Sequence, residues 1–366
     1  MRLGLVVYGD LDYISGGFLY DRKLVEYLKK SGDDVEIISI EWKRYSLNIF
    51  DNLSSKLSKH MQNGRYDVLL EDELNHSSLF ILNRKLKKEC NFPIISIVHH
   101  LKSSERGPKW RNFFYRTIER SYLNSVDGFI FNSQTTRNSA IENCPDIKNF
   151  PNIVAYPAGD HLDPAIKEEE IIHRADEKGP LRVLFVGNLI PRKGLHDLIE
   201  AIRNLPRGGI LLTIAGDPSI DPGYFRKLKN QVKRLNLQDF VRFSGFVQEK
   251  SLRILYRSHH VLAVPSSYEG YGIVYLEGMG YGLPAIGTTS GAASDIITHN
   301  KDGFLITAGD VNALAGHLET VSNNRHKLRE MALEAYQHFH RQPGWEQNDR
   351  KIREFLVENI KNHENP

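Results

Sequence analysis

A chain of 366 residues is too long for one ordinary hydrophobic core, so its length predicts two domains. Its 40% hydrophobic and 25% charged residues are typical of a globular protein, and no apolar run approaches the length of a membrane span. A net charge of +3 is too small to indicate binding to nucleic acid. Cys90 and Cys144 form neither a CxxC pair nor a disulfide framework, which favours a reducing cytoplasm.

The first half of the chain alternates predicted strands and helices. The first strand is followed at once by Gly9-Asp10, so its apolar run is too short for a signal-peptide core. A glycine turn, Ser15-Gly16-Gly17, then leads into a helix. Strand–helix alternation of this kind predicts a parallel, doubly wound sheet. The predicted strands cover residues 2–8, 34–40, 68–70, 94–98 and 128–131, and the predicted helices include 20–30 and 109–123.

A charged stretch, 167–179, precedes a second alternation, and we expect a linker near 165–180. The expected organisation is an N-terminal Rossmann-like domain over 1–170 and a C-terminal one over 171–345. Packing of a final helix, 346–366, back onto the first domain is a hypothesis. Ligands of such folds bind beyond the carboxyl ends of the strands, so we expect a ligand in a cleft between the sheets. The second set of strands is predicted at 181–186, 210–215, 241–243, 261–264, 285–287 and within 298–305, with helices at 194–203, 224–235, 251–257 and 345–360.

The segment from Val264 to Pro284 carries the strongest functional signal. A strand ends at Val264, a Pro/Ser/Gly-rich turn follows, and a helix begins near Gly272. The backbone N–H groups of Gly272, Ile273 and Val274 are unpaired donors at this helix start, where a phosphate binds readily. Glu269 precedes this start and Glu277 lies within the helix, an arrangement that suits a ligand with hydroxyls at both ends. The alternative is a turn acid and a solvated helix acid.

Cations and glycines follow two other predicted strands. Arg192 and Lys193 lie just before a helix, where they either clamp a diphosphate or remain solvated loop charges. Gly16-Gly17 allows a backbone to approach a phosphate or sugar closely. The pattern is not GxGxxG, so a nicotinamide enzyme is poorly supported. Asp10 and Asp12 are more typical of a turn than of a cation site, and no metal ligand is predicted.

Two further features lie after the strand 94–98. His99 and His100 are candidates for a hydrogen bond to a sugar hydroxyl or for proton transfer, with a packed or capping histidine as the alternative. The segment 102–120 mixes six basic residues, Arg106 among them, with interleaved aromatic residues. Such a helix either docks on anionic lipid at the inner face of a membrane or is a surface helix that buries its aromatic stripe. We favour the buried stripe.

The chain resembles the retaining glycosyltransferases of the GT-B fold, specifically glycosyltransferase family 4. The resemblance covers nearly the whole length and is strongest from 181 to 305. The family commonly has an arginine where this chain has Asn188, and a glutamate where it has Asp295. The segments that carry the resemblance are Val186-Gly187 with Pro191-Arg192-Lys193-Gly194, Ile214-Ala215-Gly216-Asp217, Phe243-Ser244-Gly245-Phe246-Val247, the block 265–284 with its two glutamates, and Asp302-Gly303-Phe304-Leu305.

The resemblance implies transfer of a hexose from a nucleoside diphosphate sugar to an acceptor, which is a lipid, a glycan or a small molecule, with no obligatory cofactor. It implies that Glu269 holds hydroxyls of the donor sugar, that Glu277 binds the ribose, and that Lys193 neutralises the diphosphate. Further implied donor contacts come from Gly16, Gly17, Arg192, Gly270, Tyr271, Gly272, Ile273 and Val274, and His99 is implied to contact the sugar.

Two other classes of function stay open at this point. One is a GT-B-fold isomerase that acts on the sugar nucleotide itself, and the other is a non-catalytic protein that binds nucleotide sugar. Epimerised donor would identify the first. Absence of donor hydrolysis would identify the second.

Overall fold

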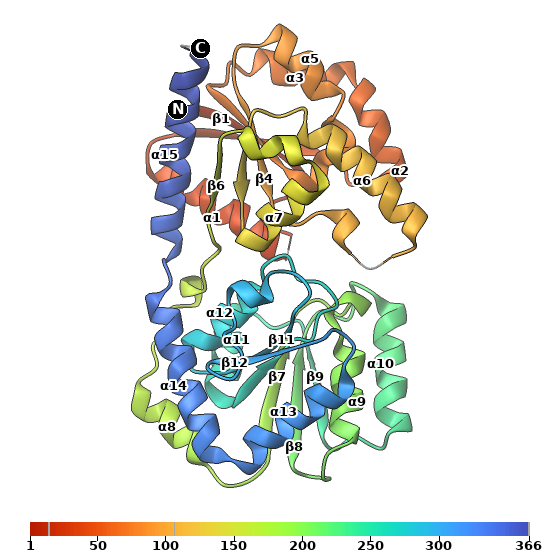
Figure 1. Ribbon diagram of the computed structural model, residues 1–366, viewed down its shortest axis with the longest axis vertical. Coiled ribbons are helices and arrows are strands. Elements are labelled where there is room, and N and C mark those ends of the chain that lie inside the picture. The colour runs from red at the N-terminus through yellow and green to blue at the C-terminus, as the bar shows by residue number, and fades with distance from the viewer. Residues whose placement is uncertain (14, 106, 365–366) are drawn as a thin grey trace. The chain divides into compact units, whose positions relative to one another are not determined.

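The computed structural model describes residues 1–13, 15–105 and 107–364 (Figure 1). The chain forms two compact units: unit 1 comprises Met1–Pro157 together with the chain from Trp345 onward, and unit 2 comprises Ala158–Gly344. Each unit contains one six-stranded sheet in which all strand pairs are parallel. In the described part of the chain, no helix combines the length and the apolar composition that crossing a bilayer requires.

The sheet of unit 1 has the strand order β2-β1-β3-β4-β5-β6. Its strands are mostly apolar on both faces because helices cover them, as a parallel sheet requires. The strands are β1 Arg2–Tyr8, β2 Asp34–Ile40, β3 Val68–Asp72, β4 Ile94–Val98, β5 Gly128–Phe131 and β6 Asn152–Val154. The helices are α1 Gly16–Lys30, α2 Tyr45–Asn48, α3 Ser55–Asn63, α4 His76–Leu79, α5 Leu82–Glu89, α6 Lys109–Leu123, α7 Gln134–Asn143 and α15 Trp345–Glu364.

Helix α15 is part of unit 1 although it lies at the other end of the chain. It packs against α1, beside which it runs in Figure 1. The Arg353 guanidinium donates to the Asp33 carboxylate over 2.7 Å, and the Asn348 amide donates to the Tyr156 carbonyl over 2.7 Å. These contacts join residues 192 and 320 positions apart and hold the helix on the sheet domain.

The sheet of unit 2 has the strand order β12-β11-β10-β7-β8-β9. Counted within the unit this is the order 3-2-1-4-5-6 of a Rossmann fold, in which the direction of strand succession reverses between β7 and β10. The strands are β7 Leu181–Val186, β8 Ile210–Ala215, β9 Val241–Gly245, β10 Val261–Ala263, β11 Ala285–Thr288 and β12 Gly303–Ile306. The helices are α8 Glu168–Asp176, α9 Leu195–Arg203, α10 Pro222–Arg234, α11 Glu249–Ser258, α12 Ile273–Gly280, α13 Val311–Asn323 and α14 Arg325–Arg341.

The linker predicted near 165–180 was wrong, because that stretch forms α8 and belongs to unit 2. The units divide between Pro157 and Ala158 rather than after residue 170. Ile171 and Ala175 are buried, and α8 packs against α14. The buried Arg174 guanidinium donates to the carbonyls of Tyr281 and Gly282, both over 2.8 Å. The charged residues that suggested a linker are the solvent face of this helix.

Candidate active site

Two loops meet at the point of unit 2 where the strand order reverses. One loop follows β7 and contains Lys193, and the other follows β10 and contains Glu269. Because β7 and β10 are neighbours in the sheet, their carboxyl ends bring these loops together. Gly194 (φ 68°) is where they touch: a Cβ atom there would lie 2.0 Å from the Pro265 carbonyl oxygen. Only glycine tolerates that approach.

Lys193 and Glu269 form a buried ion pair. The Lys193 Nζ lies 2.6 Å from Glu269 Oε2, and the two side chains are 12% and 11% exposed. The Ser266 hydroxyl donates to the same oxygen over 2.9 Å. Burial alone would raise the pKa of Glu269, but the charges of Lys193 and Arg192 outweigh it and lower that pKa to about 2. Burial lowers the pKa of Lys193. The carboxylate of Glu269 is therefore ionised at neutral pH.

Arg192 is tied to the same turn. Its guanidinium donates to the Tyr268 carbonyl over 2.6 Å and lies 3.9 Å from Glu269 Oε1, while its own carbonyl accepts from the Ser267 N–H over 2.7 Å. Part of its donor capacity is thus used within the protein. The guanidinium has five N–H donors, and one is enough for Tyr268, so Arg192 retains the capacity to bind an anion.

Gly291 supports the Glu269 turn from the loop after β11. Its backbone pairs with Glu269 in an isolated parallel bridge, with the Glu269 N–H donating to the Ser290 carbonyl and the Ala292 N–H donating to the Glu269 carbonyl. A Cβ at Gly291 would lie 2.1 Å from the Glu269 carbonyl oxygen. The position of the carboxylate therefore depends on a glycine that the sequence analysis did not single out.

Helix α12 begins next to this turn. Gly272 is its N-cap at φ 94°, preceded by Gly270 and Tyr271, and Ile273 and Val274 form its first turn. The first N–H groups of a helix have no intrahelical acceptor, so they point outward as donors for an anion. Tyr275 fixes the helix start, because its hydroxyl donates to the Val264 carbonyl over 2.7 Å.

Glu277 lies one turn further along α12 and is buried. The Tyr256 hydroxyl donates to its Oε2 over 2.6 Å, and the His161 Nε2 lies 3.4 Å from its Oε1. Burial raises the pKa of Glu277 to about 7, although the Tyr256 hydrogen bond and the charge of Lys193 oppose that rise. Glu269 and Glu277 thus titrate far apart, because the Lys193 ammonium group is in direct contact with Glu269, whereas burial is the largest influence on Glu277.

This pKa gives a pH prediction for ligand binding. If Glu277 accepts hydrogen bonds from ribose hydroxyls, its carboxylate form binds better than its protonated form. With a pKa near 7, the ionised fraction falls about tenfold between about pH 8 and about pH 6, and the affinity for a nucleotide sugar should fall by about the same factor. Calorimetric titration over this pH range measures the change in affinity. Glu277→Gln should make the affinity nearly independent of pH.

A second variant separates Glu277 from other titrating groups. Tyr256→Phe removes a hydrogen bond that stabilises the carboxylate, so the midpoint of the pH profile should move upward. Tyr336→Phe is the matched control, because it also removes one tyrosine hydroxyl bond in unit 2, to the Ile166 carbonyl. An affinity that does not change between these pH values would contradict a role for Glu277 in binding.

The candidate residues of unit 1 come together at the carboxyl edge of its own sheet. Gly16 and Gly17 were predicted in a turn before the helix, but they form the first turn of α1, which Ser15 caps through a hydrogen bond from the Phe18 N–H. A Cβ at Gly17 would lie 3.2 Å from the His99 ring. Ile14, which precedes the predicted turn, lies outside the described residues. Asp10 accepts from the Asp12 N–H over 3.1 Å, as in a local turn.

His99 is held by the buried Asp21, whose Oδ1 lies 3.1 Å from its Nε2. Burial opposes the charged imidazolium, but the charge and hydrogen bond of Asp21, with the charges of Asp72 and Glu73, raise the pKa of His99 to about 9. His99, Asp21 and Asp72 are close enough to share a cation. The imidazolium itself supplies a positive charge there. His100 instead lies 3.2 Å from Glu105.

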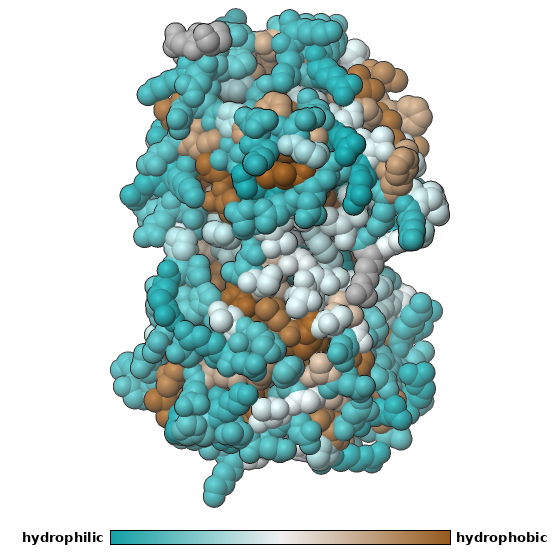
Figure 2. All heavy atoms as spheres, in the orientation of Figure 1, coloured by the Kyte–Doolittle hydropathy of each residue, from teal (hydrophilic) through white to brown (hydrophobic). Residues whose placement is uncertain are grey.

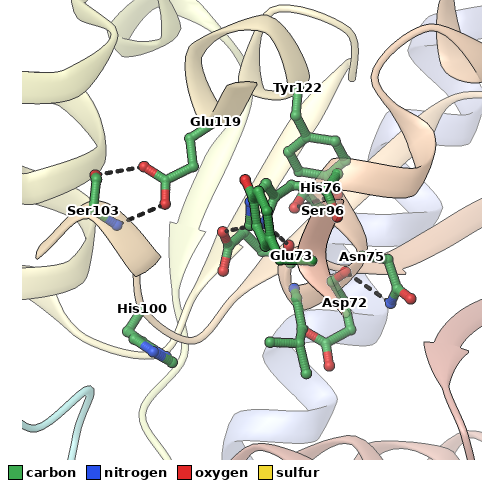
Figure 3. A network of polar contacts seen from close by, with 12 residues as sticks. Asp72, Glu73, Asn75, His76, Ser96, His100, Ser103, Glu119 and Tyr122 are labelled. Atoms are coloured by element: carbon green, nitrogen blue, oxygen red, sulfur yellow. Dashed lines mark hydrogen bonds and ion pairs between the residues drawn. The ribbon is translucent and has the colours of Figure 1, made fainter. Parts of the chain in front are cut away.

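A second buried polar cluster lies at the end of β3 (Figure 3). The His76 Nδ1 lies 3.2 Å from Glu73 Oε1, and the buried Glu119 accepts from the N–H and hydroxyl of Ser103. Glu73 raises the pKa of His76 against the effect of burial. Glu73, His76 and Glu119 could also share a cation by distance. These residues form hydrogen bonds with neighbouring elements, so the cluster is explained as a group that stabilises the interior of unit 1.

Several residues that contact the candidate site carry no signal in the sequence. Ser266 stands in a turn that was noticed for its composition, but its bond to Glu269 depends on the fold. Tyr256 and Asp21 lie on α-helices and His161 in the 3-10 turn Asp160–Leu162, each far along the chain from the carboxylate or imidazole that it contacts. Such pairings arise from sheet topology and leave no local pattern.

Sequence comparisons with known proteins find glycosyltransferases, and structural comparisons find proteins of the same fold. The sequence model of the family described as glycosyl transferases group 1 matches residues 166–338. An uncharacterized glycosyltransferase of Methanocaldococcus jannaschii is 25% identical over 88% of this chain and 89% of its own length. Sucrose-phosphate synthase from Thermosynechococcus elongatus superimposes with a TM-score of 0.82 at 20% identity, over 98% of this chain and 99% of that one. Anabaena HepE in complex with UDP-glucose gives 0.75 at 19% identity, over 98% and 100%.

Proposed function

We propose, from the premise that the chain belongs through residues 166–338 to the glycosyl transferases of group 1, that it moves a hexose from a nucleoside diphosphate sugar to an acceptor hydroxyl with retention of configuration. The two Rossmann-like domains of this GT-B protein accord with that family. The observation that carries the proposal is the Lys193–Glu269 pair beside the start of α12. Retention rests on the resemblance to glycosyltransferase family 4.

The chemistry of the donor explains why these groups are needed together. When the bond between the sugar and the diphosphate breaks, negative charge grows on the diphosphate and positive charge on the sugar. We propose that Lys193, Arg192 and the N–H groups of Gly272–Val274 bind the diphosphate, since preorganised donors stabilise developing charge best. Glu269, ionised at neutral pH, then lies beside the electron-poor sugar and accepts from its hydroxyls.

The other proposed contacts follow from the same resemblance. Glu277 would bind the ribose, and Gly270 and Tyr271 would line the donor site. The assignment of Gly16, Gly17 and His99 of unit 1 to the phosphates and sugar stays a prediction. In this proposal no metal takes part, because side-chain cations and backbone donors supply the charge compensation.

A donor screen in EDTA tests the proposal. We expect one of UDP-, GDP- or ADP-hexose to raise the melting temperature, since a ligand at 100 times its dissociation constant adds about 2.7 kcal/mol to stability. Slow donor hydrolysis without loss of the sugar's anomeric configuration should accompany binding. The matching nucleoside monophosphate is the control for binding that ignores the diphosphate.

Each other outcome points to a different function. Epimerised donor would make the protein an isomerase, and binding without any turnover would make it a nucleotide-sugar binding protein. Activity lost in EDTA and restored by magnesium would contradict the metal-free mechanism. A chain that binds none of the three donors would contradict the proposal as a whole.

A further inference from the structure

Helix α6 presents its aromatic side chains to solvent. Trp110, Phe113 and Phe114 are 75%, 73% and 44% exposed. Their spacing of three and four residues places them on one face of the helix. The interpretation favoured from the sequence, a surface helix that buries its aromatic stripe, was wrong. The buried anchors of α6 are instead at its C-terminal half, where Ile118, Tyr122 and Leu123 meet the core.

The same exposed half of the helix is basic. Lys109, Arg111 and Arg116 are exposed beside the aromatic residues, while Arg106 of the preceding loop lies outside the described residues. Within 107–123, all of which the structure describes, Glu119 is the one acidic residue, and it is fully buried. The solvent face of this helix therefore carries positive charge without an exposed counter-charge of its own.

A neighbouring element extends the apolar area. The 3-10 turn Ile49–Leu53 directly follows α2, and Leu47, Phe50 and Leu53 of this segment are exposed. The Tyr45 ring at the start of α2 lies 6.3 Å from the Phe114 ring and 4.6 Å from the Tyr115 ring, so the two segments are in contact. Figure 2 shows hydrophobic side chains exposed at the upper right, over the region where Figure 1 draws α2.

We propose that the basic aromatic face of α6, formed by Lys109, Trp110, Arg111, Phe113, Phe114 and Arg116, docks on a bilayer that contains anionic lipid. Aromatic side chains that project from a helix insert at the level of the headgroups, and the cations pair with lipid phosphates. The charge of this face complements an anionic surface. The proposal rests on the exposed face alone and does not depend on which reaction the protein catalyses.

Vesicle sedimentation with the full chain tests the proposal. We expect binding to phosphatidylcholine vesicles with 30% phosphatidylglycerol, and at least roughly fivefold weaker binding for each basic residue reversed in Lys109→Glu and Arg116→Glu. Trp110→Ala/Phe113→Ala should weaken binding by roughly tenfold or more. These side chains are exposed, so the variants should fold. Ile220→Ala/Ile254→Ala is the matched control, because it removes two exposed apolar side chains from unit 2.

The fluorescence of Trp110 provides a second measurement. On addition of anionic vesicles its emission should shift to shorter wavelength, and Trp110→Phe should abolish that shift while keeping most of the binding. Vesicle binding that the aromatic double variant leaves unchanged would overturn the proposal. So would equal binding to pure phosphatidylcholine, or no binding at low salt.

Discussion

Lys193→Ala should lower the turnover number by roughly 10²–10³, which is the usual effect of removing one preorganised donor from developing negative charge. The Lys193 ammonium group is held 2.6 Å from the Glu269 carboxylate. Its loop follows β7, and the loop that leads into α12 follows the neighbouring strand β10, so both lie at the same edge of the sheet. The ammonium group therefore needs no reorganisation to meet a diphosphate. Steady-state kinetics with the donor found in the screen measures the loss.

The same substitution also leaves a buried carboxylate without its closest cation, with only Arg192 3.9 Å away, so a loss of stability of up to about 3–5 kcal/mol should accompany it. The double variant Lys193→Ala/Glu269→Gln removes both charges and should recover much of this stability, but not the turnover. Lys301→Ala is the control for loss of a lysine, because its pair with Glu334 in unit 2 is exposed and worth at most about 1 kcal/mol. Turnover that returns together with stability would show that Lys193 has only a structural role.

Gly291→Ala should lower turnover by roughly 10–100-fold, although residue 291 carries no functional group. Its backbone angles, φ 92° and ψ −155°, are adopted almost only by glycine, and the added Cβ would meet the Glu269 carbonyl at 2.1 Å. The Glu269 turn must therefore move, and a displacement of about 1 Å of a reacting group costs about 10²-fold in rate.

Gly309→Ala is the matched control for this prediction. Gly309 lies in the same unit at φ 86°, but a Cβ there would meet no atom within 4 Å. Gly309→Ala therefore measures the loss of stability and turnover that a side chain at positive φ causes by itself, without a collision with neighbouring atoms. Urea unfolding and turnover should be measured for both variants. Equal losses in the two would contradict the view that Gly291 positions Glu269.

Much of the fold could be predicted because its strands are continuous apolar runs between turn residues. The predicted bounds of β1, β2, β4, β5, β7 and β8, and those of α6, agree with the structure. Failures occurred where tertiary contacts decide. Helix α8 has a charged face that resembles a linker, and its Arg174 finds acceptors more than 80 positions away. In α6 the periodicity was correct, but the aromatic stripe it identified faces solvent.

The candidate site could also be predicted only in part: single residues were identified, but the contacts between them were not. Lys193 and Glu269 were each identified, because their loops carry glycine, proline and serine in a distinctive order. The two side chains touch because β7 and β10 are neighbours in the sheet. The order of the strands in the sheet determines this contact, and the local sequence does not show that order. Ser266, Tyr256, His161 and Gly291 act through contacts in space. No local sequence pattern indicates which of these residues are in contact.

The return of α15 to unit 1 has a consequence for synthesis on the ribosome. Unit 2 is one uninterrupted stretch, and its two ends are close together, since a Cβ at Gly344 would lie 2.4 Å from the Asp160 carboxylate. It can fold as soon as its last strand and helices emerge. The β-sheet of unit 1 emerges before unit 2, yet α1 stays without its covering helix until residues 345–364 are made. Of the two units, the one that begins to emerge first is thus completed after the other, and the apolar surface that α15 covers stays open while unit 2 is being made.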